Sequence, residues 1–238
     1  MLTYLERTEY ELLNLLIGVE KPVGSVALNL LLKEKKMNLS SATIGRILAR
    51  FDYQGLTVKN GFRGRLLTDE GQKRFEDLKS KQRLAELTSK FYESIDAESK
   101  DNLIDVLIAR RGIEQEAARL AVLNATKEDL QNLEKLYKLQ SEDITNGLVS
   151  ADIDVLFHQG IGKASKNKVL AAAYDFIWQN GRFSPVMEYI RRAVGGVIAA
   201  DHGKILNALL ARDADKAAKC MINHINSLIN DVKKYGNP

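Results

Sequence analysis

Residues 41–71 read SATIGRILARFDYQGLTVKNGFRGRLLTDEG, and they join a helical pattern to a hairpin pattern. Apolar residues first recur at the three- and four-residue spacing of one helix face. These are Ile44, Ile47, Leu48 and Phe51. A serine pair can cap this helix and Gly55 can end it, so a helix is predicted over residues 40–54. Leu56–Lys59 and Arg65–Thr68 then predict two short strands around a glycine-rich turn.

Two further helices are predicted upstream of this stretch. The first runs from Arg7 to Val19 and ends before the Lys21-Pro22 pair, because proline cannot continue a helix. The second begins near Gly24-Ser25 and runs through ALNLLLKEKK. Three helices followed by a hairpin is the order of a winged helix-turn-helix, so a DNA-binding domain with a β-hairpin wing is predicted over residues 1–78.

Basic charge is concentrated in the same region. The formal net charge of the chain is +4. Residues 31–65 hold eight Lys or Arg against Glu34 and Asp52, so this segment carries +6 and all other residues together carry −2. A basic patch on a helix and a hairpin predicts binding to the phosphates of double-stranded DNA.

The helix over residues 40–54 has the polar face that a recognition helix needs. Short polar and cationic side chains lie opposite its apolar stripe, and an arginine near the hairpin turn can reach phosphate. The predicted DNA contacts are Ser41, Thr43, Arg46, Arg50, Arg63 and Arg65. The same residues leave an alternative open, a solvated basic helix with a hairpin that contacts protein. The closing motif GFRGRLLTDEG of residues 61–71 resembles winged helix-turn-helix domains of prokaryotic regulators, which implies the fold and says nothing about the operator.

The rest of the chain is predicted to be helical throughout. It has few prolines and long stretches of helical apolar periodicity, which make the fold class mostly α. A charged connecting helix is expected over residues 79–97, and an antiparallel all-helical bundle over residues 98–238. The expected helices are 98–123, 127–145, 151–165, 167–180, 184–197, 199–211 and 213–235. Their expected caps include Thr126, Ser150 and Asn167.

All three histidines of the chain lie in this helical part. Asp154 and His158 are four residues apart, so their side chains leave one helix on the same face. His202 and His224 have apolar neighbours that direct them toward the core. Three imidazoles and a carboxylate suit a divalent transition metal, Zn²⁺, Ni²⁺ or Mn²⁺. The alternative is three core histidines whose hydrogen bonds are satisfied within the protein.

The C-terminal part resembles the FCD ligand-binding domain of FadR-like regulators in the GntR superfamily. Four motifs in the same order carry the resemblance, over roughly residues 98–235. They are RRGIExxAARLA from Arg110, DVLFHQGIGKASKN from Asp154, DHGKILNALLARD from Asp201 and AAKCMINHI from Ala217. The resemblance implies that Asp154, His158, His202 and His224 bind the metal. It further implies that Arg110 binds a ligand carboxylate through its planar fork, and that Asn167 lines the pocket.

This chain departs from the family at three places. Lys166 replaces a small residue, and Asp201 stands where a Glu commonly precedes the histidine. Both changes leave the candidate ligands in place. The N-terminal part lacks the PSExxLA…VSRxPVRxAL pattern of the usual GntR winged helix, so an atypical winged helix is expected, and the family's rules for operator recognition do not transfer.

Together these features predict a DNA-binding transcription regulator, a homodimer, whose operator affinity is controlled by a small carboxylate effector at the metal site. Two alternatives stay open. In the first alternative the protein is a metal sensor, and the ion itself is the signal. In the second it is a metallohydrolase, because a metal site of this kind can lower the pKa of bound water. No nucleophile motif accompanies the ligands, so we expect no enzyme. No apolar run approaches the roughly 18 residues that span a bilayer, and the first residues lack a signal-peptide pattern, so a cytoplasmic protein without a membrane partner is expected.

Overall fold

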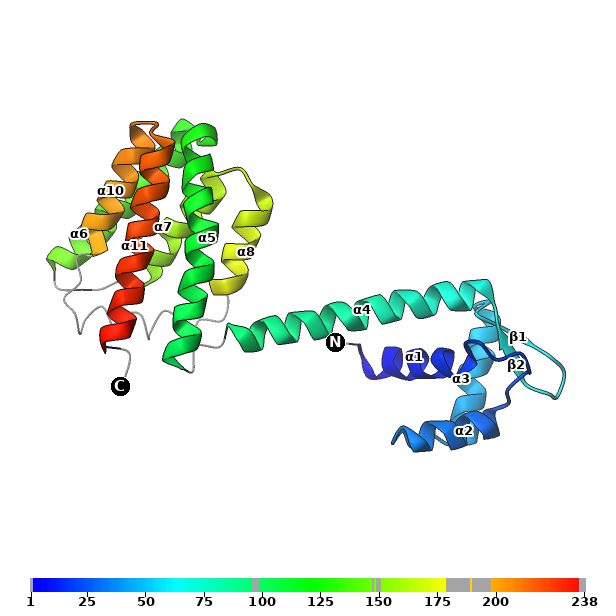
Figure 1. The fold of residues 1–238 in the computed structure, drawn as a ribbon. Helices are drawn as coiled ribbons and strands as arrows, with labels where there is room; N and C mark the ends of the chain where they lie inside the picture. The colour runs from blue at the N-terminus through cyan, green and yellow to red at the C-terminus, as the bar shows by residue number, and fades with distance from the viewer. Residues whose placement is uncertain are drawn as a thin grey trace. The chain divides into compact units, whose positions relative to one another are not determined.

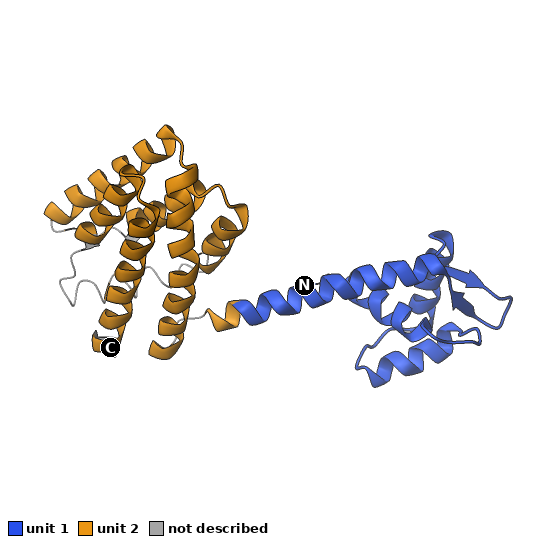
Figure 2. Ribbon diagram, turned by 45° about the horizontal axis from the view of Figure 1, so that its top comes forward, with its two compact units in different colours: residues 1–91 blue, residues 92–238 orange. Residues whose placement is uncertain are grey.

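The computed structural model describes most of the chain, and the chain divides into two compact units, residues 1–91 and 92–238 (Figure 2). The described residues are 2–95, 99–146, 148, 151–178, 189 and 198–235. Across these ranges, no helix has both the length and the apolar character that crossing a bilayer requires.

The first unit contains the predicted helices and hairpin (Figure 1). Its elements are α1 (Tyr4–Leu16), α2 (Ser25–Glu34), α3 (Ser41–Tyr53), β1 (Thr57–Lys59), β2 (Arg65–Leu67) and α4 (Asp69–Ser94). The two strands are antiparallel, with Thr57 opposite Leu67 and Lys59 opposite Arg65. Helix α1 begins three residues earlier than predicted, because Thr3 and Glu6 form a capping box there.

The apolar stripe of α3 forms the centre of this unit. Ile44, Leu48 and Phe51 are fully buried, and Ile47 packs against the same core. Ser40 caps the helix, since its hydroxyl accepts a hydrogen bond from the Thr43 amide. The predicted inward face of α3 is therefore confirmed, and its opposite face is left toward solvent.

The hairpin is attached to α3 by one carboxylate. Asp52 accepts hydrogen bonds from Arg65 Nε at 2.9 Å and from the Thr57 hydroxyl at 2.7 Å. The backbone of Arg65 also exchanges two hydrogen bonds with that of Val23, both 3.0 Å long. These contacts fix the base of the hairpin to both neighbouring segments.

Helix α4 is one continuous helix from the end of the hairpin to Ser94. It begins inside the segment that was expected to belong to the winged helix and covers most of the expected connecting helix. The division between the units falls after Phe91, near its end. Good helix-forming residues fill α4 without a proline, so no break is required near residue 80.

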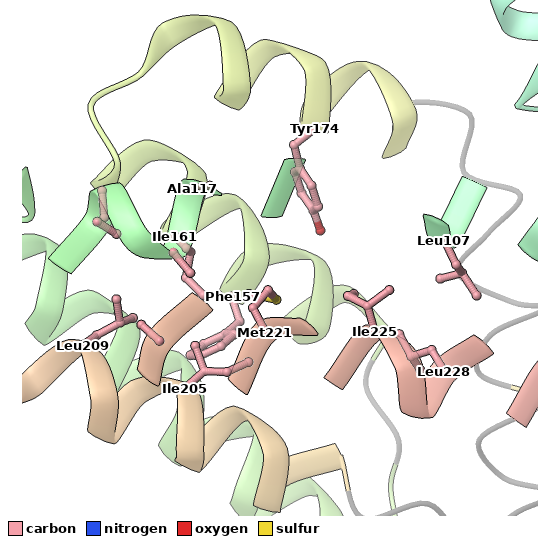
Figure 3. Close-up of a cluster of buried hydrophobic side chains, with 14 of the residues drawn as sticks. Leu107, Ala117, Phe157, Ile161, Tyr174, Ile205, Leu209, Met221, Ile225 and Leu228 are labelled. Carbon is pink, nitrogen blue, oxygen red and sulfur yellow. The ribbon is translucent and has the colours of Figure 1, made fainter. Parts of the chain in front are cut away.

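The second unit is an all-helical bundle, as predicted. Its described elements are α5 (Lys100–Asn124), α6 (Lys127–Thr145), α7 (Ala151–Ala164), α8 (Lys168–Trp178), α10 (Ile198–Leu210) and α11 (Ala214–Tyr235). Helices α5 and α11 lie side by side (Figure 1). Figure 3 shows Phe157, Ile205 and Met221, from α7, α10 and α11, in their shared core. The expected helix over residues 184–197, apart from Tyr189, and the cap Ser150 lie outside the described residues.

Replacing Gly71 by Ala is expected to destabilise the first unit. A Cβ at this position would lie 2.1 Å from the Leu56 carbonyl oxygen, and such overpacking costs about 1–3 kcal/mol of the free energy of unfolding. The control is Gly45→Ala in α3, where a Cβ meets no atom within 4 Å and helix propensity gains up to about 1 kcal/mol. Urea unfolding followed by circular dichroism measures both. Equal stability of the two variants would contradict the close approach.

Candidate functional site

Four side chains from three helices meet inside the second unit. Asp154 and His158 come from α7, His202 from α10 and His224 from α11, and the candidate ligand atoms all lie within 4.8 Å of one another. Each of the three histidines is at most 2% exposed. The structure therefore brings together the four residues that the sequence singled out.

Two of these imidazoles have an acceptor close to Nδ1, and one of the two contacts, at His202, has the geometry of a hydrogen bond. His158 Nδ1 lies 2.5 Å from Glu114 Oε2, and His202 Nδ1 lies 2.6 Å from Gln140 Oε1. An acceptor at Nδ1 places the ring proton there and leaves the Nε2 lone pair for a metal. His202 Nε2 lies 3.4 Å from Asp154 Oδ1, so this nitrogen faces the cluster.

His224 has a carboxylate beside it as well. Its Nδ1 lies 3.8 Å from Asp201 Oδ2. The nearby His224 ring, then the hydrogen bond from Lys204, lowers the pKa of Asp201 far below its usual value, so this carboxyl is ionised. Each of the three rings thus has an acceptor on its Nδ1 side, the arrangement that metal-binding histidines have in proteins. The donor set fits a divalent transition metal.

A buried arginine lies next to this cluster. Arg110 is 1% exposed, and its Nε donates to Glu114 Oε1 at 2.5 Å, while the other oxygen of Glu114 faces His158. Burial alone would raise the pKa of Glu114, but Arg110 and then His158 outweigh burial and lower it to about 2. The guanidinium lies over the Trp178 ring, 4.6 Å from its centre. Arg110 Nη2 and the Tyr174 hydroxyl have no hydrogen-bond partner among the described residues.

A narrow internal pocket adjoins the cluster. It is too constricted to admit a water-sized sphere. Its lining residues are Ile113, Glu114, Ala117, His158, Ile161, Gly162, Leu170, Tyr174 and Met221. A few polar groups in a mostly apolar wall are typical of small-molecule sites. A ligand that entered here would have to displace side chains.

The model of the FCD domain family matches residues 105–227, which is more than half of the chain and includes all four ligand candidates. The chain belongs to the FCD-domain family. This finding confirms the resemblance of the C-terminal part to the FCD domain.

Two curated regulatory proteins each match somewhat more than half of this chain. The putative L-lactate dehydrogenase operon regulatory protein of Escherichia coli is 28% identical over 144 residues, which cover 58% of this chain and 55% of the relative. The Uxu operon regulator of Haemophilus influenzae is 28% identical over 130 residues, 52% of this chain and 48% of the relative. The chain thus spans about half the length of the curated relatives it matches.

The comparisons also bear on the fold and the N-terminal unit. Escherichia coli McbR/YncC, a solved structure, has a TM-score of 0.50 at 18% identity, over 99% of this chain and 100% of that protein, which is a likeness of fold. The model of the ribonuclease R winged-helix domain matches residues 10–75. A winged helix of a different type therefore precedes the FCD domain, as the missing GntR pattern indicated.

Asn167 has a structural role at the edge of the FCD domain. Its side-chain oxygen accepts hydrogen bonds from the amides of Val169 and Leu170 at the start of α8. The structure thus engages this side chain in the capping role expected for it, and it is not among the residues that line the pocket. Lys166 has a φ of 57°, and its ammonium pairs with Asp129 at 2.5 Å.

The candidate DNA contacts divide into two groups. Arg46, Arg50 and Arg63 are exposed, and Ser41 and Thr43 are partly exposed on α3. Arg65 instead pairs with Asp52, and its side chain is only 14% exposed. Its guanidinium is used to hold the hairpin.

Four residues of the FCD site escaped sequence analysis. They are Glu114, Gln140, Tyr174 and Asp201. Only Glu114 had a local signal, because its position four residues after Arg110 places both on one face of α5. Gln140 is 62 residues from the histidine that it orients, and nothing in a single sequence joins such a pair.

Replacing Glu114 by Ala is expected to destabilise the FCD domain by roughly 3–5 kcal/mol, because it leaves the guanidinium of Arg110 buried without its partner. Glu116→Ala is the control on the same helix. Glu116 pairs with Arg119 at 2.6 Å, but both side chains are about 40% exposed, so this loss is expected to stay below about 1 kcal/mol. Urea unfolding followed by circular dichroism compares the two. Similar losses would argue against a buried charge pair.

Proposed function

We propose that this chain is a DNA-binding transcription regulator whose affinity for its operator depends on a small carboxylate bound at a metal site in the FCD domain. The observation that carries the proposal is the buried cluster of three histidines and an aspartate beside Arg110. The curated relatives are named as operon regulators, which supports the regulatory part of the proposal.

In this proposal Asp154, His158, His202 and His224 hold a divalent ion, Zn²⁺, Ni²⁺ or Mn²⁺. The carboxylates and imidazoles of the cluster suit these borderline cations. A bound ion supplies a fixed positive charge with coordination positions left for an anionic ligand. The residues around it orient the rings and keep bulk water away, since all three imidazoles are buried.

Arg110 is the second anchor for the carboxylate. Its Nη2 lacks a hydrogen-bond partner among the described residues, although the side chain is buried. Such an unmade bond costs about 1–3 kcal/mol, more for a charged group, which a ligand oxygen would recover. The hydroxyl of Tyr174, which lines the narrow pocket beside the cluster, offers a further hydrogen bond. A carboxylate held by both the ion and the guanidinium of Arg110 therefore gains two charged partners.

DNA binding is assigned to α3 and the hairpin. The exposed arginines Arg46, Arg50 and Arg63 supply phosphate contacts, and Ser41 and Thr43 stand on the face that would enter the major groove. A homodimer would present two such units to paired half-sites. Linkage then requires that a ligand which weakens DNA binding is itself bound more weakly by the DNA complex.

Arg46→Ala and Arg50→Ala are each expected to weaken binding to duplex DNA. Loss of one phosphate contact should also reduce the slope of log affinity against log salt by about 0.9. The control is Arg83→Ala, which removes an exposed arginine of α4 in the same unit. Fluorescence anisotropy of a labelled duplex over a salt series gives both quantities. Binding that responds equally to all three substitutions would contradict the assignment to α3.

Asp154→Asn is expected to lower Zn²⁺ affinity and to abolish the response of DNA binding to carboxylates. Partners that only orient a ligand are worth about 10- to 100-fold in metal affinity, so loss of a ligand should cost at least as much. Asp152→Asn, an exposed aspartate two residues away on α7, is the control. Elemental analysis measures retained metal, and anisotropy with acetate and lactate measures the response.

The same measurements separate the proposal from a metal sensor. A tightly held ion and a DNA affinity that changes only with the carboxylate support the proposed function. Weak, reversible metal binding that alters DNA affinity without any carboxylate would make the ion the signal and overturn the effector assignment. Full DNA response to carboxylates in Asp154→Asn would overturn the role of the cluster.

A further inference from the structure

The hairpin carries an aromatic side chain at its tip. Phe62 lies between β1 and β2, and its relative exposure of 109% is the highest among the exposed large hydrophobic residues of the described chain. The turn around it is closed by hydrogen bonds from the Asn60 amide to the Gly64 carbonyl, 2.9 Å, and from the Arg63 amide to the Asn60 carbonyl, 3.0 Å. The phenyl ring is therefore presented to solvent by a closed turn.

The base of the hairpin is held firmly. Asp52 binds Arg65 and Thr57, and the Val23 backbone pairs with that of Arg65. Gly64 has a φ of 124°, and a Cβ there would lie 2.3 Å from the Val23 carbonyl carbon. The hairpin backbone at Gly64 thus lies too close to the Val23 backbone for any residue with a Cβ. A turn mounted in this way can present Phe62 without a large loss of conformational entropy on binding.

The surroundings of Phe62 identify the kind of partner. Arg63 follows it directly and is exposed, and Lys59 is exposed at the end of β1. No acidic residue lies between Thr57 and Thr68. An apolar protein surface would gain nothing from these cations, whereas duplex DNA offers phosphates for them and stacked bases for the ring. Side chains such as Phe are inserted as wedges between base steps from the minor groove.

We propose that Phe62 is an intercalating wedge, which enters the minor groove of DNA and partly unstacks a base step while Arg63 and Lys59 contact the adjacent phosphates. The inference rests on the proposed DNA-binding function and adds a specificity-determining residue to it. Unstacking costs least at flexible pyrimidine–purine steps such as TA. The wedge therefore favours sites with such a step under the hairpin, without any base-edge hydrogen bond.

The test compares the full chain and its variants on two duplexes of equal length. One has alternating TA steps with 2-aminopurine in place of some adenines, and the other is an uninterrupted A-tract. Phe62→Ala is expected to weaken binding to the TA duplex by about tenfold and to have little effect on the A-tract. It should leave the salt slope unchanged, because the ring displaces no counterion. Arg63→Ala should reduce that slope by about 0.9 on both duplexes.

Two variants complete the experiment. Phe62→Leu keeps an apolar wedge and should stay within about threefold of the unmodified chain. Leu87→Ala, an exposed leucine of α4, controls for loss of apolar surface elsewhere in the unit and should bind normally. The 2-aminopurine fluorescence should rise on binding of the unmodified chain and of Phe62→Leu, and stay low with Phe62→Ala.

The outcomes distinguish the two proposals. Equal losses on both duplexes, or no change with Phe62→Ala, would overturn the wedge while DNA binding itself stands. The same holds if 2-aminopurine fluorescence stays low with the unmodified chain bound. Failure of the unmodified chain to bind either duplex would overturn the DNA-binding function and the wedge with it.

Discussion

A guanidinium inside a helical core has to be neutralised, and in this protein one carboxylate does so. Glu114 binds Arg110 through one oxygen and faces His158 with the other. The cost of burying either charge alone is several kcal/mol, so the two groups remain in the core only together. This shared carboxylate joins the candidate anion-binding arginine to the candidate metal site. Movement of Arg110 toward a ligand would therefore shift Glu114 and change its contact with the His158 ring.

The first unit depends on a similar arrangement with a different consequence. Asp52, at the end of α3, holds both strands of the hairpin through Arg65 and Thr57. Helix α3 and the hairpin are thereby positioned as one piece. An arginine that sequence analysis placed against phosphate is used for this attachment. The exposed cations Arg46, Arg50 and Arg63 are left for a partner.

Periodic and local features of this protein were predictable from sequence, and pairings across the fold were not. The stripe of α3 and the spacing of Asp154 and His158 follow from helix geometry, so both were found. The meeting of the three histidines was predicted because separate family motifs carried them. Gln140 and Asp201 act through tertiary contacts, which have no periodicity to detect. The early start of α1 had a readable signal in Thr3 and Glu6, which form its capping box.

The chain contains a single tryptophan, and that residue stacks on Arg110. Indole emission depends on nearby charge, so the emission of Trp178, excited selectively over the tyrosines, reports on the surroundings of Arg110. Other tryptophans contribute no background, because none exist. The FCD domain thus contains its own optical reporter, with which binding of the proposed carboxylate beside Arg110 can be followed in the unlabelled protein.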